Sequence, residues 1–306
     1  MRELMPANSM AILFNNPVKN RSNDVDFIYH PNTDFYYLTG FREPNSALII
    51  FSEKRMIDGM ETDEIIYVQP RDPRSEMWNG KRLGTEGVQE VLGFQTVFLF
   101  DDFGKKPVLN AGDFDKILSM DLGAEIEGSS ANAPLRRMIA DFKKNANYPS
   151  DKSPVSLQMY DLIRATDIEN SANVAQIIGR YRQRYPEVEN DEILRNFVEA
   201  DSPEKRMEVK SKIPASKTDL FALSQMMDVL REVKTAEEIA LLRKAVKISA
   251  IGQIEVMKAA KPGMSEREVQ GIHEFIYKRY GAEGIGYPSI VGAGNNGCIL
   301  HYIDND

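Results

Sequence analysis

The chain has 306 residues, which is enough for two domains that each have a core of their own. The formal net charge of −8 argues against nucleic acid as the main partner, because binding to a phosphate backbone depends on clustered Lys and Arg. The single Cys298 excludes an internal disulfide and a Cys-based zinc site. No stretch approaches the roughly 20 apolar residues of a membrane helix, and the apolar run 10–14 is too short for a signal peptide. We therefore expect a soluble, cytoplasmic protein that does not bind membranes.

Short apolar runs in the first part of the chain predict the strands of a buried sheet. They are residues 47–51 (ALIIF), 65–68 (IIYV), 94–100 (FQTVFLF) and 116–120 (KILSM). Runs of this length, bounded by Gly, Pro, Asp and Glu, are typical of strands that helices cover on both faces. Residues 85–92 can form a short helix between the second and third runs. This alternation predicts an α/β fold.

Helices are predicted from about residue 153 onward, because apolar residues recur there at spacings of three and four. We interpret residues 148–220 as a helical extension of the first domain. Two capping boxes, at 235–238 (TAEE) and 265–268 (SERE), then begin longer helices, since their Ser, Thr and Glu side chains bond the free backbone amides of a helix start. Pro262 and Gly263 end the first of these helices, and Tyr280 and Gly281 end the second.

The segment after these helices is predicted to be a β-hairpin, with strands at 287–291 (YPSIV) and 298–302 (CILHY). The residues between them, 292–297 (GAGNNG), match the G-x-G-x-x-G dinucleotide-binding pattern letter for letter. That pattern binds a pyrophosphate where a helix follows it, but a strand-like run follows here. We therefore interpret it as a hairpin turn in which Asn and Gly supply positive φ angles.

If this segment is a strand, its candidate ligand and catalytic side chains do not point to the same face. His301 would point to one face while Asp304 and Asp306 point to the other, which argues against a local metal site and indicates a solvated turn at 304–306. Cys298 and His301 also have opposite parity, which argues against a Cys–His catalytic pair and favours Cys298 as a small buried apolar residue. We expect His273 to be a surface or half-buried residue of the second helix.

Five stretches carry a resemblance to a known family. Residues 21–27 (RSNDVDF), 33–41 (TDFYYLTGF) and 76–84 (EMWNGKRLG) resemble the N-terminal domain of aminopeptidase P, the metal-dependent Xaa-Pro aminopeptidases. The second of these stretches is long enough to be highly specific. Residues 231–239 (REVKTAEEI) resemble the hinge into the catalytic "pita-bread" domain of that family, and 286–302 resemble its first hairpin. The order of the matches argues against coincidence.

The resemblance implies both a fold and a domain organisation. Residues 1–231 would form a creatinase-like α/β domain with a mixed sheet and the helical extension. Residues 232–306 would form the first part of an incomplete pita-bread α+β domain.

The resemblance also implies a reaction. Family members remove the N-terminal residue from peptides whose second residue is proline, where the scissile bond is a tertiary amide without an N–H. Two metal ions, typically Mn²⁺, generate a hydroxide and polarise the carbonyl, and two Asp, one His and two Glu hold them. The His of the hairpin's Leu-His-Tyr binds substrate and stabilises the developing charge, a role that falls by motif position on His301.

The family's metal ligands all follow this hairpin, so we expect none of them in this chain. The expectation is that a full-length parent enzyme binds two Mn²⁺ and that these 306 residues alone are inactive. Two alternatives remain: a non-catalytic binding or scaffold protein with the same fold, and a prolidase-type or creatinase-type enzyme.

Trp78, the only tryptophan, has two interpretations. It can be a partly buried core aromatic. It can also belong to a rim that the N-terminal domain adds to a neighbouring subunit's active site, since family members form dimers and tetramers. The resemblance therefore implies a homo-oligomer.

Overall fold

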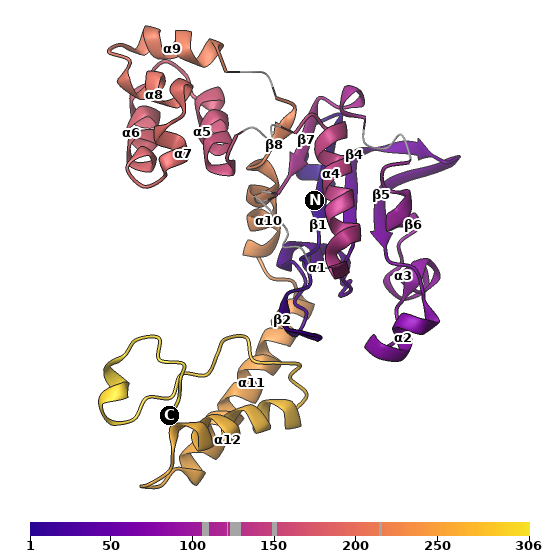
Figure 1. The fold of residues 1–306 in the computed structure, drawn as a ribbon, viewed down its shortest axis with the longest axis vertical. Helices are drawn as coiled ribbons and strands as arrows, with labels where there is room; N and C mark the ends of the chain where they lie inside the picture. Colours follow the sequence, from indigo (N-terminus) through magenta and orange to yellow (C-terminus); the bar gives the residue numbers. More distant parts are fainter. Residues whose placement is uncertain (106–109, 121, 123–129, 149–151, 214–215) are drawn as a thin grey trace. The chain divides into compact units, whose positions relative to one another are not determined.

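The computed structural model describes residues 1–105, 110–120, 122, 130–148, 152–213 and 216–306. The chain separates into two compact units, Met1–Leu230 and Arg231–Asp306, whose elements are labelled in Figure 1. A compact unit is not by itself a family domain, so the assignment of domains to 1–231 and 232–306 stays a prediction. None of the helices in the described ranges has the length and apolar character needed to cross a bilayer.

The first unit is built on a six-stranded mixed sheet with the order β6-β5-β4-β1-β7-β8. Its central strand, β1, pairs antiparallel with β4 and parallel with β7. The strands are β1 Ser9–Phe14, β4 Ala47–Ile57, β5 Met60–Val68, β6 Val97–Leu99, β7 Lys116–Ser119 and β8 Thr218–Asp219, and a separate pair is formed by β2 Asn20–Ser22 and β3 Val25–Asp26. The four predicted strands are confirmed, and the central β1 is added to them.

Helices cover both faces of this sheet, because alternate residues of its strands enter two separate cores. Residues 10, 12 and 14 of β1 enter one core, and residues 11 and 13 enter the other. Helix α4 (Ala133–Asn145) packs on the first face, where it lies over β1 and β4 (Figure 1). Helices α1, α3 and α10, which span Thr33–Thr39, Gly84–Leu92 and Ala222–Glu232, pack on the second face. Helix α3 confirms the helix predicted at 85–92.

The specific stretch 33–41 forms helix α1 and its C-cap. The side-chain oxygen of Asn32 accepts hydrogen bonds from the backbone amides of Asp34 (3.1 Å) and Phe35 (3.0 Å), which caps the helix start. Gly40 ends the helix with a φ of 67°, a left-handed angle that glycine adopts without strain. Phe35 is fully buried in the second core. This stretch is therefore a structural element of the first unit.

The predicted helices after residue 153 are confirmed and surround a third core. They are α5 Pro154–Ala165, α6 Ser171–Arg182, α7 Pro186–Glu189, α8 Glu192–Glu199 and α9 Pro203–Ser211. The buried side chains of this core include Ile163, Ile178, Val188, Leu194 and Phe197. Within the predicted extension 148–220, residues 149–151 and 214–215 lie outside the described ranges.

Asp191 links two helices of this group through its buried carboxylate. It caps α8 by accepting hydrogen bonds from the amides of Ile193 (3.0 Å) and Leu194 (3.1 Å). It also accepts from the buried hydroxyl of Tyr160 on α5, at 2.8 and 2.9 Å, and pairs with Lys152 at 2.9 Å. These bonds fix α5 against α8.

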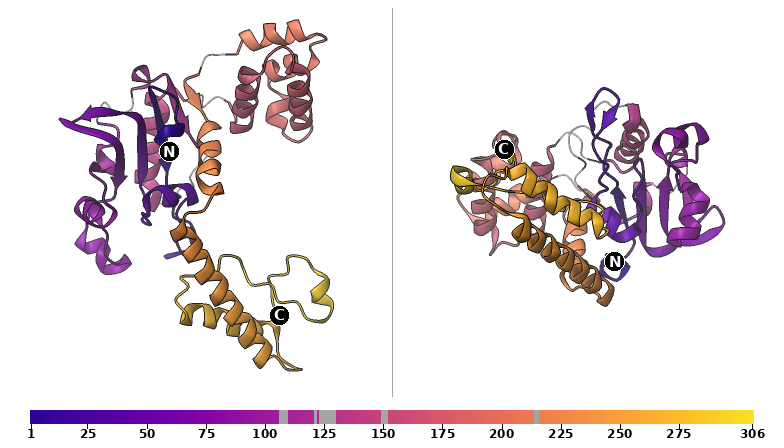
Figure 2. Two further views of the ribbon diagram at one scale, coloured as in Figure 1. Left: turned by 180° about the vertical axis from the view of Figure 1, so that it is seen from behind. Right: turned by 90° about the horizontal axis from the view of Figure 1, so that it is seen from below.

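The second unit is a pair of antiparallel helices followed by an irregular segment. Both predicted capping boxes are present, with Thr235 and Glu238 beginning α11 (Ala236–Ala259) and Ser265 and Glu268 beginning α12 (Glu266–Arg279). Figure 2 shows α11 and α12 lying side by side. They approach closely at Gly252, where an added Cβ would lie 2.7 Å from Cδ2 of His273.

The hairpin prediction for 286–302 is wrong. Among the described residues of this unit there is no strand, and residues Gly294–Cys298 form a short 3-10 helix instead. A lone two-stranded hairpin is only marginally stable in water. The described part of this unit has no further strand with which such a hairpin could pair. Of the Asn and Gly residues in 292–297, only Gly294 has a positive φ, of 53°. Cys298 is exposed, which corrects the expectation that it is buried.

Candidate functional site

His301 lies on the exposed part of the segment that follows the 3-10 helix. Its Nδ1 is 2.9 Å from the hydroxyl of Tyr287, and the two rings meet edge to face with centroids 6.3 Å apart. When Tyr287 donates to Nδ1, the neutral imidazole carries its proton on Nε2. Nε2 forms no hydrogen bond with any residue that the structure describes.

Buried polar side chains, rather than strand pairing, hold this segment against α12. The carboxylate of Glu266 is 3% exposed and accepts from the amide of Ala293 at 2.6 Å and from Asn296 Nδ2 at 3.2 Å. The Ala293 amide is the main reason that the pKa of Glu266 lies below its ordinary value. Glu266 is also the first residue of α12, where the helix dipole favours a negative charge.

Asn305 is the second anchor of the segment. It is 1% exposed with a φ of 51°, so the expectation of a solvated turn at 304–306 is wrong for this residue. Its amide accepts from Val291 N (2.9 Å) and donates to Gln270 Oε1 (2.9 Å) and to the Ser289 carbonyl (2.9 Å). It therefore joins both ends of the segment to α12.

A cleft of about 600 Å³ lies between α11, α12 and residues 286–292. His273, which is half-buried as predicted, lines it beside Tyr277, and the Tyr277 hydroxyl is 2.9 Å from His273 Nε2. Burial lowers the pKa of His273, and the neighbouring Glu274 partly opposes that shift.

Acidic side chains near His301 do not gather into a metal site. Asp304 is exposed, and Asp306 forms an ion pair with Arg267 on α12. No group of three or more His, Cys, Asp and Glu side chains that could hold a metal occurs among the residues that the structure describes.

Trp78 stands on helix α2 (Pro73–Asn79) in the first unit and is 85% exposed. The interpretation of Trp78 as a partly buried core aromatic is therefore wrong. Its neighbour Met77 is 86% exposed. Trp78 and Met77 form an exposed apolar tip on this short helix. The helix belongs to the segment 69–84, which follows β5.

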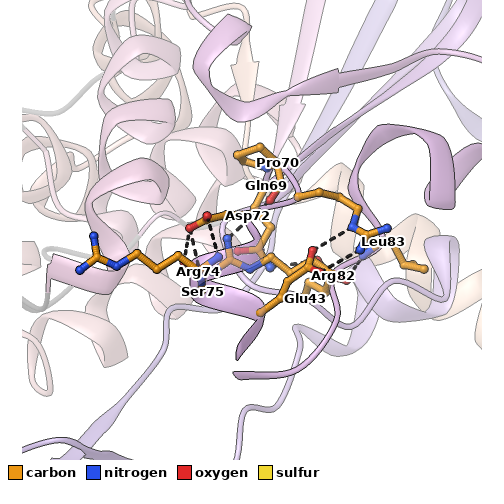
Figure 3. A network of polar contacts seen from close by, with 10 residues as sticks. Glu43, Gln69, Pro70, Asp72, Arg74, Ser75, Arg82 and Leu83 are labelled. Atoms are coloured by element: carbon orange, nitrogen blue, oxygen red, sulfur yellow. Dashed lines mark hydrogen bonds and ion pairs between the residues drawn. The ribbon is translucent and has the colours of Figure 1, made fainter. Parts of the chain in front are cut away.

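A polar network holds this tip in place. Figure 3 shows Glu43 beneath the segment, accepting from the Leu83 amide at 2.7 Å and from Gln69 Nε2 at 2.9 Å. Asp72 caps α2 by accepting from the amides of Arg74 (3.1 Å) and Ser75 (3.3 Å). The hydrogen bond from the Ser75 hydroxyl is the main cause of the lowered pKa of Asp72. Trp78 thus projects from a helix that is anchored at both ends.

Tyr287, Glu266 and Asn305 were not predicted as site residues. Glu266 lies inside a capping box. That pattern predicts hydrogen bonds for Ser265 and Glu268 and none for Glu266. The Asn-rich end of the chain is typical of turns. No local pattern in the sequence marks Tyr287 as the partner of His301.

Two family models match the chain. The model described as "Aminopeptidase P, N-terminal domain" matches residues 1–111, and the model described as "Metallopeptidase family M24" matches residues 240–306. These two matches, together with the solved structures reported below, confirm the family resemblance and the α/β plus partial pita-bread fold.

Several of the curated proteins that the chain resembles are named Xaa-Pro aminopeptidase. The chain is 27% identical over 304 residues to the enzyme of that name from Escherichia coli K12, covering 99% of this chain and 53% of the relative. It is 24% identical to human Xaa-Pro aminopeptidase 3, covering 96% of this chain and 44% of the relative. Among solved structures, aminopeptidase P from E. coli superposes with a TM-score of 0.65 at 25% identity, covering all of this chain and 53% of that one. Aminopeptidase PepP from Pseudomonas aeruginosa gives the same TM-score and identity, and 52% of it is covered. The chain spans about half the length of the curated relatives it matches.

Proposed function

We propose that the protein to which this chain belongs is a cytoplasmic, metal-dependent Xaa-Pro aminopeptidase. The observation that carries the proposal is the order of the two family matches, an aminopeptidase P N-terminal domain followed by M24 residues, together with relatives named Xaa-Pro aminopeptidase over 99% of the chain. The substrates would be peptides with proline in the second position.

His301 is the residue of this chain that we assign to substrate binding. We assign the donor role in the Tyr287–His301 hydrogen bond to the Tyr287 hydroxyl, so that Nε2 carries the proton and can donate a hydrogen bond. A fixed N–H donor stabilises an oxyanion that develops on the scissile carbonyl, because it needs no reorganisation during the reaction. Tyr287 acts as a positioning residue that holds the imidazole tautomer.

The family implies two metal ions, typically Mn²⁺, which would supply a hydroxide and polarise the substrate carbonyl. The residues described here do not fit that group, since they bring no three suitable donors together. We propose that the metal ligands belong to the part of the M24 domain that the relatives have and this chain does not span. The 306-residue chain alone should then lack peptidase activity.

The direct test compares this chain with a protein that continues through the whole M24 domain. Both are assayed with Mn²⁺ on an Xaa-Pro-Xaa tripeptide, an Xaa-Ala-Xaa control and an Xaa-Pro dipeptide. We expect turnover of the first peptide only, and only by the longer protein. Preference for the dipeptide would indicate a prolidase, and binding of peptides without hydrolysis would indicate a scaffold protein. Turnover by the 306-residue chain would refute the assignment of the ligands.

Substitutions at the His301 pair test the role of the imidazole in the longer protein. His301→Ala should lower kcat about 10²–10³-fold, as does the loss of one oxyanion donor elsewhere. Tyr287→Phe should lower kcat by a smaller factor with little change in KM, since the ring loses the partner that fixes its tautomer. An unchanged kcat in His301→Ala would exclude the proposed role.

Trp78 is proposed as a rim residue of a neighbouring subunit's site in a homo-oligomer. Its exposure and the anchored α2 support this, because a projecting aromatic without core contacts is suited to an interface. Trp78→Ala should leave stability unchanged and should raise KM or dissociate the oligomer, measured by light scattering. No change in either quantity would exclude the rim.

A further inference from the structure

A hollow of about 950 Å³ opens on the helical group of the first unit. Residues of α6, α7, α8 and α9 line it, and these helices share the third core. Ala172, Ala175 and Gly179 form part of its wall, and their small side chains leave the space open. All of its lining residues fall within 172–206, where every residue is described.

Three arginines and one acidic residue line this hollow. They are Arg180, Arg182 and Arg206, and the acidic residue is Glu189. In a chain whose net charge is −8, this excess of positive charge is local. It favours an anion over a cation as the occupant, since a cation would be repelled by the excess positive charge.

The three guanidinium groups differ in what they already bind. Arg182 is committed, because it pairs with Glu189 at 2.6 Å and with Glu199 at 3.2 Å. Arg206 donates to the Ala200 carbonyl at 2.8 Å, but its buried Nε–H has no partner among the described residues. Arg180 forms no hydrogen bond or ion pair within the described ranges and is exposed.

Unused donors of this kind point to a specific ligand chemistry. A guanidinium presents a planar fork of N–H groups that matches the oxygens of a phosphate or a carboxylate. The amides of Gln176 and Gln183, which also line the hollow, can add neutral donors.

We propose that this hollow binds an oxyanion group of a small molecule, held by the unpaired guanidinium of Arg180 and the side-chain amides of Gln176 and Gln183. The site lies outside the residues assigned to peptide hydrolysis. It therefore does not depend on the proposed peptidase function.

The test titrates the purified chain at constant ionic strength with pyrophosphate, inorganic phosphate and citrate, using calorimetry and the melting temperature. Binding stabilises the folded state in proportion to ligand occupancy, so we expect saturable binding with Kd in the millimolar range or tighter for at least one probe. Preference for the phosphates over citrate would assign a phosphoryl group, and the reverse preference would assign a carboxylate. No saturable binding of any probe overturns the proposal.

Two matched variants distinguish binding at this site from non-specific attraction of an anion by positive charge. Arg180→Ala should weaken binding by about tenfold, the loss of one charge-assisted contact. Arg184→Ala removes the same charge from an exposed residue just after α6 that does not line the hollow, and it should change Kd less than twofold. Equal losses in both variants would overturn the proposal.

A variant that fills the hollow tests the site without lowering the stability of the fold. Gly179 lies inside α6, and a Cβ there would meet only Val198 Cγ1, at an ordinary 3.8 Å. Gly179→Leu should fill the hollow and abolish binding without lowering the melting temperature, because leucine favours a helix more than glycine does. Binding that survives this substitution with an unchanged Kd would place the ligand elsewhere.

Discussion

The contact between α11 and α12 at Gly252 gives a prediction whose size can be worked out from the structure. A Cβ at this position would lie 2.7 Å from His273 Cδ2, 3.1 Å from His273 Nε2 and 3.2 Å from Tyr277 Cε1. The imidazole cannot turn away freely, since the Tyr277 hydroxyl binds it at 2.9 Å. Gly252→Ala must therefore displace two side chains.

Opposing contributions determine how much Gly252→Ala changes the free energy of unfolding. Alanine gains about 1 kcal/mol over glycine inside a helix. Overpacking costs about 1–3 kcal/mol, and loss of the His273–Tyr277 hydrogen bond costs about 1 kcal/mol more. We expect Gly252→Ala to destabilise the second unit by about 1–3 kcal/mol. Gly271→Ala, on α12, is the matched control: a Cβ there meets nothing within 4 Å, so only the gain of about 1 kcal/mol remains.

Amide hydrogen exchange read by mass spectrometry is the suitable assay, because it reports on α11 and α12 separately from the first unit. Protection of peptides covering 236–279 should fall in Gly252→Ala and rise in Gly271→Ala. Removing the ring with His273→Ala in the Gly252→Ala background should restore part of the loss, as expected for two groups in contact. Equal protection in the two glycine variants would refute the close approach.

Three further predictions concern the first unit. Asp191→Asn should destabilise the helical group by about 1–3 kcal/mol at pH 7, since the hydrogen bonds of the carboxylate with Lys152 and Tyr160 are weakened, as measured by urea unfolding. Burial alone would raise the pKa of Asp191, but hydrogen bonds from Lys152, a helix amide and Tyr160 outweigh it and lower that pKa. The carboxylate therefore stabilises the fold fully above its unfolded pKa of about 3.9, and this contribution is lost as pH falls through the lower folded value, so wild type and Asp191→Asn should converge in acid. Glu43→Ala should increase hydrogen exchange at Leu83 and in the first turn of α3, because the Leu83 amide loses its acceptor; unchanged exchange there would show that Glu43 does not hold this segment.

The sequence allowed much of the fold to be predicted, and the reasons for the misses are physical. Runs such as 47–51 and 65–68 predict strands because both their faces are buried. The capping boxes predict the starts of α11 and α12 because their bonds are local. The run Met10–Phe14 of β1 has the same length and apolar character as residues 47–51, so the same rule applies to it; it was missed because it was weighed only as a signal peptide. The hairpin was predicted wrongly because strand character depends on a partner strand, which local residues cannot supply.

The candidate site was less accessible from the sequence than the fold. His301 was found through a motif, but its contact with Tyr287 joins residues 14 positions apart across an irregular segment. Glu266 and Asn305 act through tertiary hydrogen bonds whose partners no spacing rule specifies. Trp78 could be singled out, yet its exposure depends on how the segment 69–84 leaves the sheet.

The central position of β1 has a consequence for how the chain folds as it is synthesised. β1 leaves the ribosome before its parallel neighbour β7, which follows about a hundred residues later, with Ile12 opposite Ser119. β7 in turn pairs with β8, where Leu118 lies opposite Asp219. Such long-range closures are slow, so the nascent chain must keep one edge of β1 exposed until β7 emerges. We expect folding of this unit to be completed only after residue 219 has emerged, and chaperones that shield open strand edges should matter most in that interval.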